Sequence, residues 1–148
     1  MIIRLLPNQV SGLWSVIKTG IVDIGAKEFP GDWELSNNLF QRCLAGTVQV
    51  WLGAEEGTPK AVFKGFWLTA VETDNLNGDR TLALLMIYFY KEPSLELLKE
   101  GVAAVREYAR SNTCRNITLI TPPGHREKLV EAAWGTLQKK TLYVIPVR

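Results

Sequence analysis

The hydrophobic positions of the chain repeat with a helical period at first and with a strand-like pattern from residue 48 onward. Apolar side chains three or four positions apart, the spacing of one helix face, are Val10, Leu13, Ile17, Ile21 and Ile24. A second helical run extends from residue 33 to residue 44 and ends before Gly46. A short apolar stretch over residues 2–6 precedes both runs. The first third of the chain therefore predicts one strand and two helices.

Three apolar segments in the middle of the chain predict consecutive strands. They cover residues 48–54, 61–73 and 80–90 and are rich in β-branched and aromatic side chains, which favour strands. The Asn, Asp and Gly residues between positions 74 and 79 are typical of a tight turn. Because the connections are short, we expect the three strands to pair as an antiparallel meander.

The last third of the chain returns to alternating helices and strands. The pattern predicts a helix over 94–109, a strand over 116–121, a helix over 124–135 and a final strand over 141–147. The strand–helix–strand unit from 82 to 121 predicts a parallel pair. The element order is β-α-α-β-β-β-α-β-α-β, in one domain over residues 1–148. The predicted fold class is α+β (α/β), with a mixed, mostly antiparallel central sheet flanked by helices.

Composition and charge narrow the classes of function. The chain has 148 residues, 47% hydrophobic and 22% charged, with a formal net charge of +2, which is typical of one globular domain. This charge gives no reason to expect a nucleic acid or a membrane as partner. One histidine, His125, and two distant cysteines, Cys43 and Cys114, predict no metal site and two buried free thiols. We expect a cytoplasmic protein, and incorporation into a virion fits equally well if a bacteriophage encodes the chain.

The segment from Thr81 to Gly135 combines several features in a characteristic order. An apolar strand precedes a helix that ends in REYARSNTC, and the strand RNITLITPP precedes a helix that ends in AAWG. In this order and spacing the chain resembles the GNAT family of N-acetyltransferases, and the resemblance spans nearly the whole chain. The resemblance implies a domain that binds acetyl-CoA at the end of its fourth strand, where amides and a helix N-terminus face the pyrophosphate.

The loop after the fourth strand departs from the family pattern. The family form is Q/R-x-x-G-x-G/A, and the resemblance places it on Glu96 to Gly101, which reads ELLKEG. Glu96 stands at the Gln/Arg position, Lys99 replaces the central glycine, and only Gly101 is kept. Bulky side chains and the carboxylates of Glu92 and Glu96 oppose a pyrophosphate that must approach bare amides. We therefore predict that Ser94 caps an ordinary helix with Glu96 in its first turn.

The positions that the resemblance implies for catalysis are also changed. Glu131 stands where many family members have a tyrosine acid, and Glu72 is the acidic residue nearest to the position of a base. Tyr88 is an alternative acid, although aromatic residues on an apolar strand more often pack in a core. If the chain is an enzyme, the resemblance implies catalytic residues among Tyr88, Glu131 and Glu72 and acetyl-CoA contacts at Ile87, Tyr88, Phe89, Ser94 and Gly101.

Three hypotheses about function follow. The first is a GNAT-like domain without acetyl-CoA-dependent catalysis, which needs no cofactor and acts as a binding or structural module through a protein partner or self-association. Non-catalytic relatives of this kind occur among bacteriophage proteins, including components of virions, and the compact chain resembles them. The second is a divergent N-acyltransferase that moves an acyl group from acyl-CoA to an amine and holds acetyl-CoA between the fourth and fifth strands. The third is a small-ligand sensor that uses the same cleft.

Overall fold

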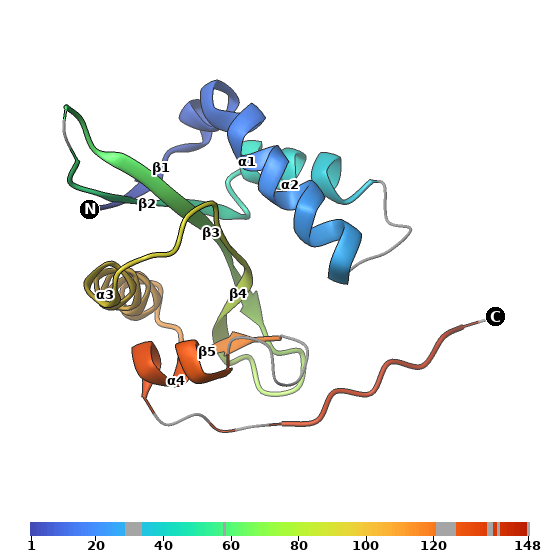
Figure 1. Cartoon of the computed structure of the whole chain (residues 1–148). Helices are drawn as coiled ribbons and strands as arrows, with labels where there is room; N and C mark the ends of the chain where they lie inside the picture. Colours follow the sequence, from blue (N-terminus) through green and yellow to red (C-terminus); the bar gives the residue numbers. More distant parts are fainter. Residues whose placement is uncertain (29–33, 58, 121–126, 136–137, 139, 148) are drawn as a thin grey trace.

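The computed structural model describes residues 1–28, 34–57, 59–120, 127–135, 138 and 140–147. The elements, labelled in Figure 1, are β1 (Ile2–Leu5), α1 (Pro7–Glu28), α2 (Leu35–Leu44), β2 (Gln49–Glu55), β3 (Val62–Thr73), β4 (Arg80–Phe89), α3 (Leu95–Ser111), β5 (Asn116–Leu119) and α4 (Glu127–Trp134). The predicted order is confirmed from the first strand through the last helix. His125 and Trp33 lie outside the described residues.

The strands form one sheet in the order β1-β2-β3-β4-β5. The first four strands pair antiparallel, and β5 pairs parallel with β4. The predicted meander, the predicted parallel pair and the predicted mixed sheet are therefore confirmed. A register shift lies between Leu68 and Thr69, which pair with Met86 and Leu84, so that Leu85 is an additional residue in β4. Such a β-bulge changes which face of the sheet the following side chains occupy.

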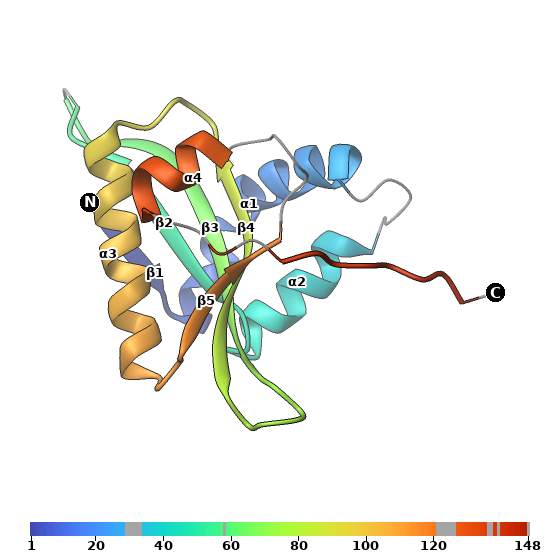
Figure 2. The same cartoon turned by 90° about the horizontal axis from the view of Figure 1, so that it is seen from below.

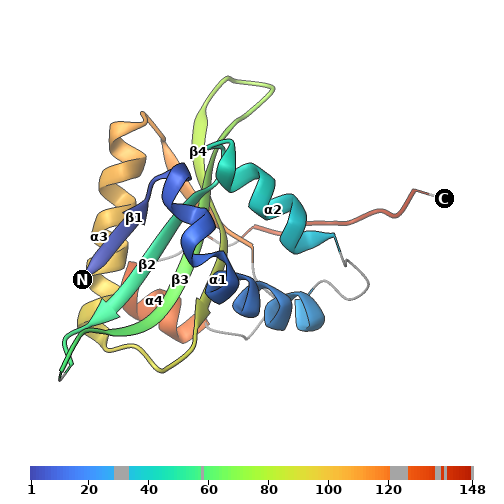
Figure 3. The same ribbon diagram turned by 90° about the horizontal axis from the view of Figure 1, so that it is seen from above.

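Helices cover both faces of the sheet, as the two opposite views of Figures 2 and 3 show. On one face α1 and α2 bury Ile17, Ile21 and Cys43 against Phe66 and Leu68. On the other face α3 buries residues such as Val105 and Ala109 against Trp51, Trp67, Leu82 and Leu84. Both layers are apolar, so the hydrophobic effect holds each helix pair to its own side of the sheet.

Gly20 allows α1 to lie very close to the sheet. A Cβ atom at this position would be 2.5 Å from Cε1 of Phe66 and 2.7 Å from Cδ1 of Tyr88, distances that real Cβ atoms do not adopt. Gly12 in the same helix has no neighbouring atom within 4 Å of such a Cβ atom. These two glycines of α1 therefore have different roles, and of the two only Gly20 sets the distance between helix and sheet.

The predicted final strand over residues 141–147 is not formed. These residues are extended, lie outside every strand, and run away from the sheet toward the C-terminus in Figure 1. Leu142, Tyr143, Val144, Ile145 and Val147 are between 63% and 99% exposed. A strand needs a neighbouring edge as well as β-branched residues, and no neighbouring strand pairs with this segment among the described residues.

The two cysteines differ in their surroundings. Both are free thiols, and Cys43 is buried whereas Cys114 is only partly buried, so the prediction of two buried thiols is wrong for Cys114. Burial raises the pKa of the Cys43 thiol to about 11. None of the helices that the structure describes has the length and apolar character of a membrane span.

Candidate functional site

The N-terminus of α3 is closed by its own N-cap residue. Ser94 has extended dihedral angles, φ −72° and ψ 158°, and its Oγ accepts a hydrogen bond from the amide of Leu97 at 3.1 Å. Glu96 lies in the first turn, where its charge complements the partial positive charge of the helix end. This geometry confirms the predicted helix start at Ser94.

A second carboxylate reaches the same helix end from the sheet. Oε1 of Glu55, the last residue of β2, accepts a hydrogen bond from the amide of Ser94 at 2.7 Å. Its Oε2 lies 3.2 Å from Nζ of Lys64, and both side chains are mostly buried, at 25% and 19% exposed. Hydrogen bonds from the Ser94 hydroxyl and amide, followed by the contact with Lys64, lower the pKa of Glu55 to about 2. Glu55 is therefore ionised throughout the neutral range.

The Glu55 carboxylate lies at the kind of position that a bound anion takes at a helix N-terminus. Anions bind there because the first amides of a helix lack intrahelical partners and the helix dipole favours negative charge. In this chain Ser94 Oγ and Glu55 Oε1 each satisfy one of these amides. Glu55 was missed in the sequence because 39 residues separate it from Ser94, and a lone glutamate at the end of a strand carries no local signal.

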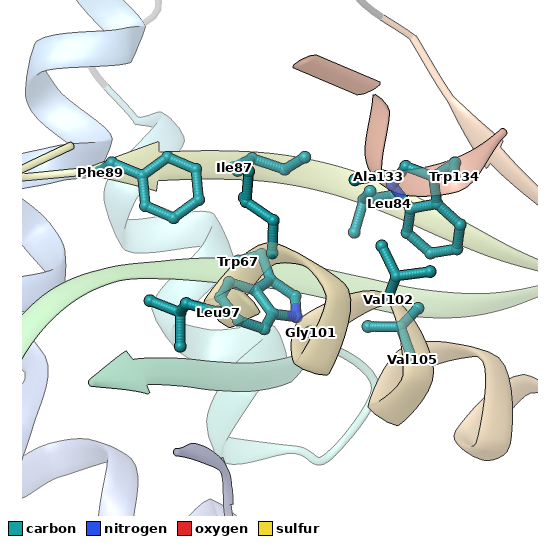
Figure 4. Close-up of a pocket in the computed structure, with 11 residues that line it drawn as sticks. Trp67, Leu84, Ile87, Phe89, Leu97, Gly101, Val102, Val105, Ala133 and Trp134 are labelled. Carbon is teal, nitrogen blue, oxygen red and sulfur yellow. The ribbon is translucent and has the colours of Figure 1, made fainter. Parts of the chain in front are cut away.

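An apolar cavity of about 50 Å³ lies between the sheet, α3 and α4 (Figure 4). Its lining residues are Trp67, Leu84, Ile87, Phe89, Leu97, Leu98, Gly101, Val102, Val105, Ala133 and Trp134. Three of the residues predicted to contact acetyl-CoA, Ile87, Phe89 and Gly101, meet here. Ser94 lies at the start of α3, and Tyr88 packs on the opposite face of the sheet.

The three candidate catalytic residues lie in different places. The hydroxyl of Tyr88 donates to Oδ2 of Asp23 in α1 at 2.8 Å, on the face that α1 covers. Glu72 is exposed near the end of β3, opposite Thr81. Glu131 is exposed on α4. The structure therefore does not bring Tyr88, Glu72 and Glu131 together around one reacting group.

The fifth strand pairs along its whole length, but only with the first half of β4. The parallel register joins Thr81–Leu84 to Asn116–Leu119, whereas β4 continues to Phe89. Pairing therefore ends at Leu84, immediately before the bulge at Leu85. The lining residues Ile87 and Phe89 belong to the part of β4 beyond this point.

Solved structures with a similar fold include acetyltransferases. A probable acetyltransferase superposes with a TM-score of 0.73 at 14% identity, over 100% of this chain and 98% of that chain. A ribosomal-protein-alanine N-acetyltransferase from Brucella melitensis biovar Abortus 2308 gives 0.65 at 11% identity, over 99% of each chain. The aminoglycoside N-acetyltransferase AAC(6')-Iy in complex with CoA gives 0.64 at 18% identity, over 100% of this chain and 99% of that chain.

Comparison of the sequence alone gives no match. No protein-family model matches the chain, and no curated protein matches it. The structural similarity covers 100% of this chain. The chain therefore has the GNAT fold, the fold of the N-acetyltransferases to which its sequence pattern is similar.

Proposed function

We propose that this chain is a GNAT-fold binding module that does not carry out acetyl-CoA-dependent catalysis. The proposal rests on one observation, the hydrogen bond of 2.7 Å from the amide of Ser94 to the carboxylate of Glu55. Through this bond the start of α3 already binds an anionic group of the chain itself, the Glu55 carboxylate. A pyrophosphate at the same helix end would meet the charges of Glu55 and Glu96 and would have to displace an existing hydrogen bond.

Thermal unfolding with and without millimolar acetyl-CoA tests this proposal. A ligand at 100 times its dissociation constant stabilises the folded state by about 2.7 kcal/mol, which raises the Tm of a domain of this size by about 8 °C. We expect no shift with acetyl-CoA or with CoA. A saturable shift with either compound would contradict the proposal.

The exposed C-terminal segment over residues 141–147 supports the binding role. Five of its side chains are large, apolar and between 63% and 99% exposed, and exposed apolar segments of this kind are typical of protein contacts. Its β-branched residues suit addition to a sheet edge. The strand β5 forms such an edge and pairs with β4 alone among the described residues. The proposed partner is a protein, either a second copy of this chain or another chain.

Light scattering coupled to gel filtration tests the role of this segment in self-association. We expect the intact chain to form a defined oligomer and the Val144→Asp variant to be monomeric, because the new charge cannot be buried in a strand pair without a partner. Leu76→Asp is the matched control, since Leu76 is 98% exposed in the turn between β3 and β4. If the intact chain is a monomer, a pull-down with the same two variants tests contact with another protein. Equal behaviour of both variants would contradict a role for this segment.

A second function, transfer of an acyl group from acyl-CoA to an amine, is favoured by a different observation. Pairing of β4 with β5 ends at Leu84, and Ile87, Phe89 and Gly101 line a cavity beside the unpaired length. If acyl-CoA binds there, holding its acyl group next to the amine accelerates the transfer without a catalytic side chain. Release of CoA from acetyl-CoA in the presence of a panel of amines measures this activity directly.

A further inference from the structure

A second cavity lies at the end of the edge strand β1, where the chain turns into α1. It measures about 100 Å³, and its polar lining includes Arg4 from β1, Gln49 from the start of β2 and Tyr108 from α3. Figure 3 shows β1 beside α3 and its continuation into α1. No residue lines both this cavity and the one in Figure 4, so the two are separate spaces.

Aromatic rings hold the guanidinium of Arg4 at the wall of this cavity. Its Cζ lies 4.7 Å from the ring centroid of Tyr108 and 6.0 Å from that of Trp51. The two rings meet edge to face, with centroids 5.5 Å apart, and Trp51 is fixed in turn by its hydrogen bond to Thr69. Because the faces of aromatic rings attract cations, the guanidinium has a defined position before any ligand arrives.

The guanidinium of Arg4 has no anionic partner in the described part of the chain. None of the ion pairs between described residues includes Arg4, and its side chain donates no hydrogen bond to a described residue. By contrast, Arg115 lies 2.9 Å from Asp79. No acidic residue lines the cavity. An anion in this space would therefore meet a permanent positive charge and up to five N–H donors without a competing carboxylate.

The chemistry of the lining selects the class of anion. The apolar part of the wall consists of Leu5, Leu6, Pro7, Val10 and Val48. A single cation beside an apolar wall suits a ligand with one negative charge and an aliphatic body. A planar carboxylate also matches the guanidinium through two parallel hydrogen bonds, whereas a phosphate, with a charge nearer −2, would need further donors.

We propose that this cavity binds a small aliphatic monocarboxylate, whose carboxylate pairs with Arg4 and whose body contacts Val10 and Val48. This inference goes beyond the proposed function and does not depend on whether the chain binds acetyl-CoA or a protein. About 10–15 Å³ of the volume holds one water, so the space suits a ligand of about eight non-hydrogen atoms. Because Arg4 is exposed, water screens the ion pair, and we expect a dissociation constant of about 1 mM.

Nuclear magnetic resonance of methyl groups tests the proposal on the intact chain. The probe is 4-methylpentanoate, and 4-methylpentanamide is the uncharged comparison with the same number of non-hydrogen atoms. We expect the carboxylate to shift the methyl resonances of Val10 and Val48 in a saturable way. The methyl resonances of Leu97 and Val102, which line the other cavity, should stay in place. The amide should bind about tenfold more weakly because it lacks the charge, and inorganic phosphate should shift none of these resonances.

Three variants separate the guanidinium from charge in general. Arg4→Gln removes the cation, so we expect about tenfold weaker binding of 4-methylpentanoate. Arg4→Lys keeps the charge but loses the planar fork, so the loss should be smaller, about threefold. Arg115→Gln is the matched control, because it removes the same charge from a residue that already pairs with Asp79, and binding should be unchanged.

The same titrations give the results that would overturn the proposal. Absence of a saturable shift of Val10 and Val48 in the unaltered chain would show that the cavity binds no such ligand. Equal affinity of Arg4→Gln and the unaltered chain would show that Arg4 does not hold the carboxylate. Binding of the amide or of phosphate as tightly as 4-methylpentanoate would overturn the proposed ligand class.

Discussion

Replacement of Ser94 by alanine tests whether the start of α3 is built as a helix cap. The substitution removes the hydrogen bond of 3.1 Å from the Leu97 amide to Ser94 Oγ. It also removes the hydroxyl that hydrogen-bonds to Glu55 and keeps the backbone amide that donates to Glu55. Loss of a serine N-cap costs about 1 kcal/mol of stability. For a chain of this length we expect the Tm to fall by about 3 °C.

Chemical denaturation of the unaltered chain and of three variants measures this effect. Ser94→Thr keeps an acceptor oxygen and should lose less stability than Ser94→Ala. Ser94→Gly should lose only about 0.3 kcal/mol of stability, because glycine tolerates the N-cap dihedral angles. If Ser94→Ala is as stable as the unaltered chain, the Ser94 hydroxyl does not cap the helix. The hydroxyl would then be free to bind a ligand at the start of α3.

Three further predictions concern charge, close packing and thiol reactivity. Because the pKa of Glu55 falls from 4.5 to about 2 on folding, the stability that Glu55→Gln removes should be present above about pH 4.5 and vanish as the pH falls toward 2. In urea denaturation, Gly20→Ala should destabilise the chain by about 2 kcal/mol through overpacking, whereas Gly12→Ala should stabilise it by about 1 kcal/mol. A thiol reagent at pH 8 should modify Cys114 in the folded chain and Cys43 only after unfolding, because burial raises the pKa of Cys43.

The features that the sequence predicts correctly depend on neighbours along the chain. The start of α3 is one example, because a serine before an apolar periodic run and a glutamate in the first turn are local signals. The helix face of α1 is another, since Val10, Ile17 and Ile21 are each no more than 1% exposed. Leu13 follows the same spacing and is 38% exposed. The spacing therefore predicts which face of the helix is buried, but not which residues at the border of that face are exposed.

The β-bulge in β4 explains why Tyr88 does not lie in the cavity. Side chains of a regular strand alternate, so Leu84 and Tyr88, four positions apart, would lie on the same face. Leu85 is the additional residue, and both it and Met86 pack on the α1 side of the sheet. The alternation is thereby reversed, and Ile87 and Phe89 line the cavity in place of Tyr88. No residue type at this point of the sequence signals the reversal.

Contacts between distant segments could not be predicted from the sequence. Glu55 is 39 residues from Ser94, and Asp23 is 65 residues from Tyr88. Both pairs form only after the sheet has brought β2, β4 and the helices together. The C-terminal segment is the opposite case, because its residues 141–147 have the composition of a strand and lack a paired edge in the structure.

The amide resonances of Ser94 and Leu97 test the central claim most directly. These two amides donate to Glu55 Oε1 and Ser94 Oγ, so a pyrophosphate bound at the start of α3 would change their surroundings. Titration of the isotope-labelled chain with CoA should leave both resonances in place while millimolar ligand is added. A saturable displacement of both resonances would show that the cofactor reaches the helix end despite Glu55, and would contradict the account.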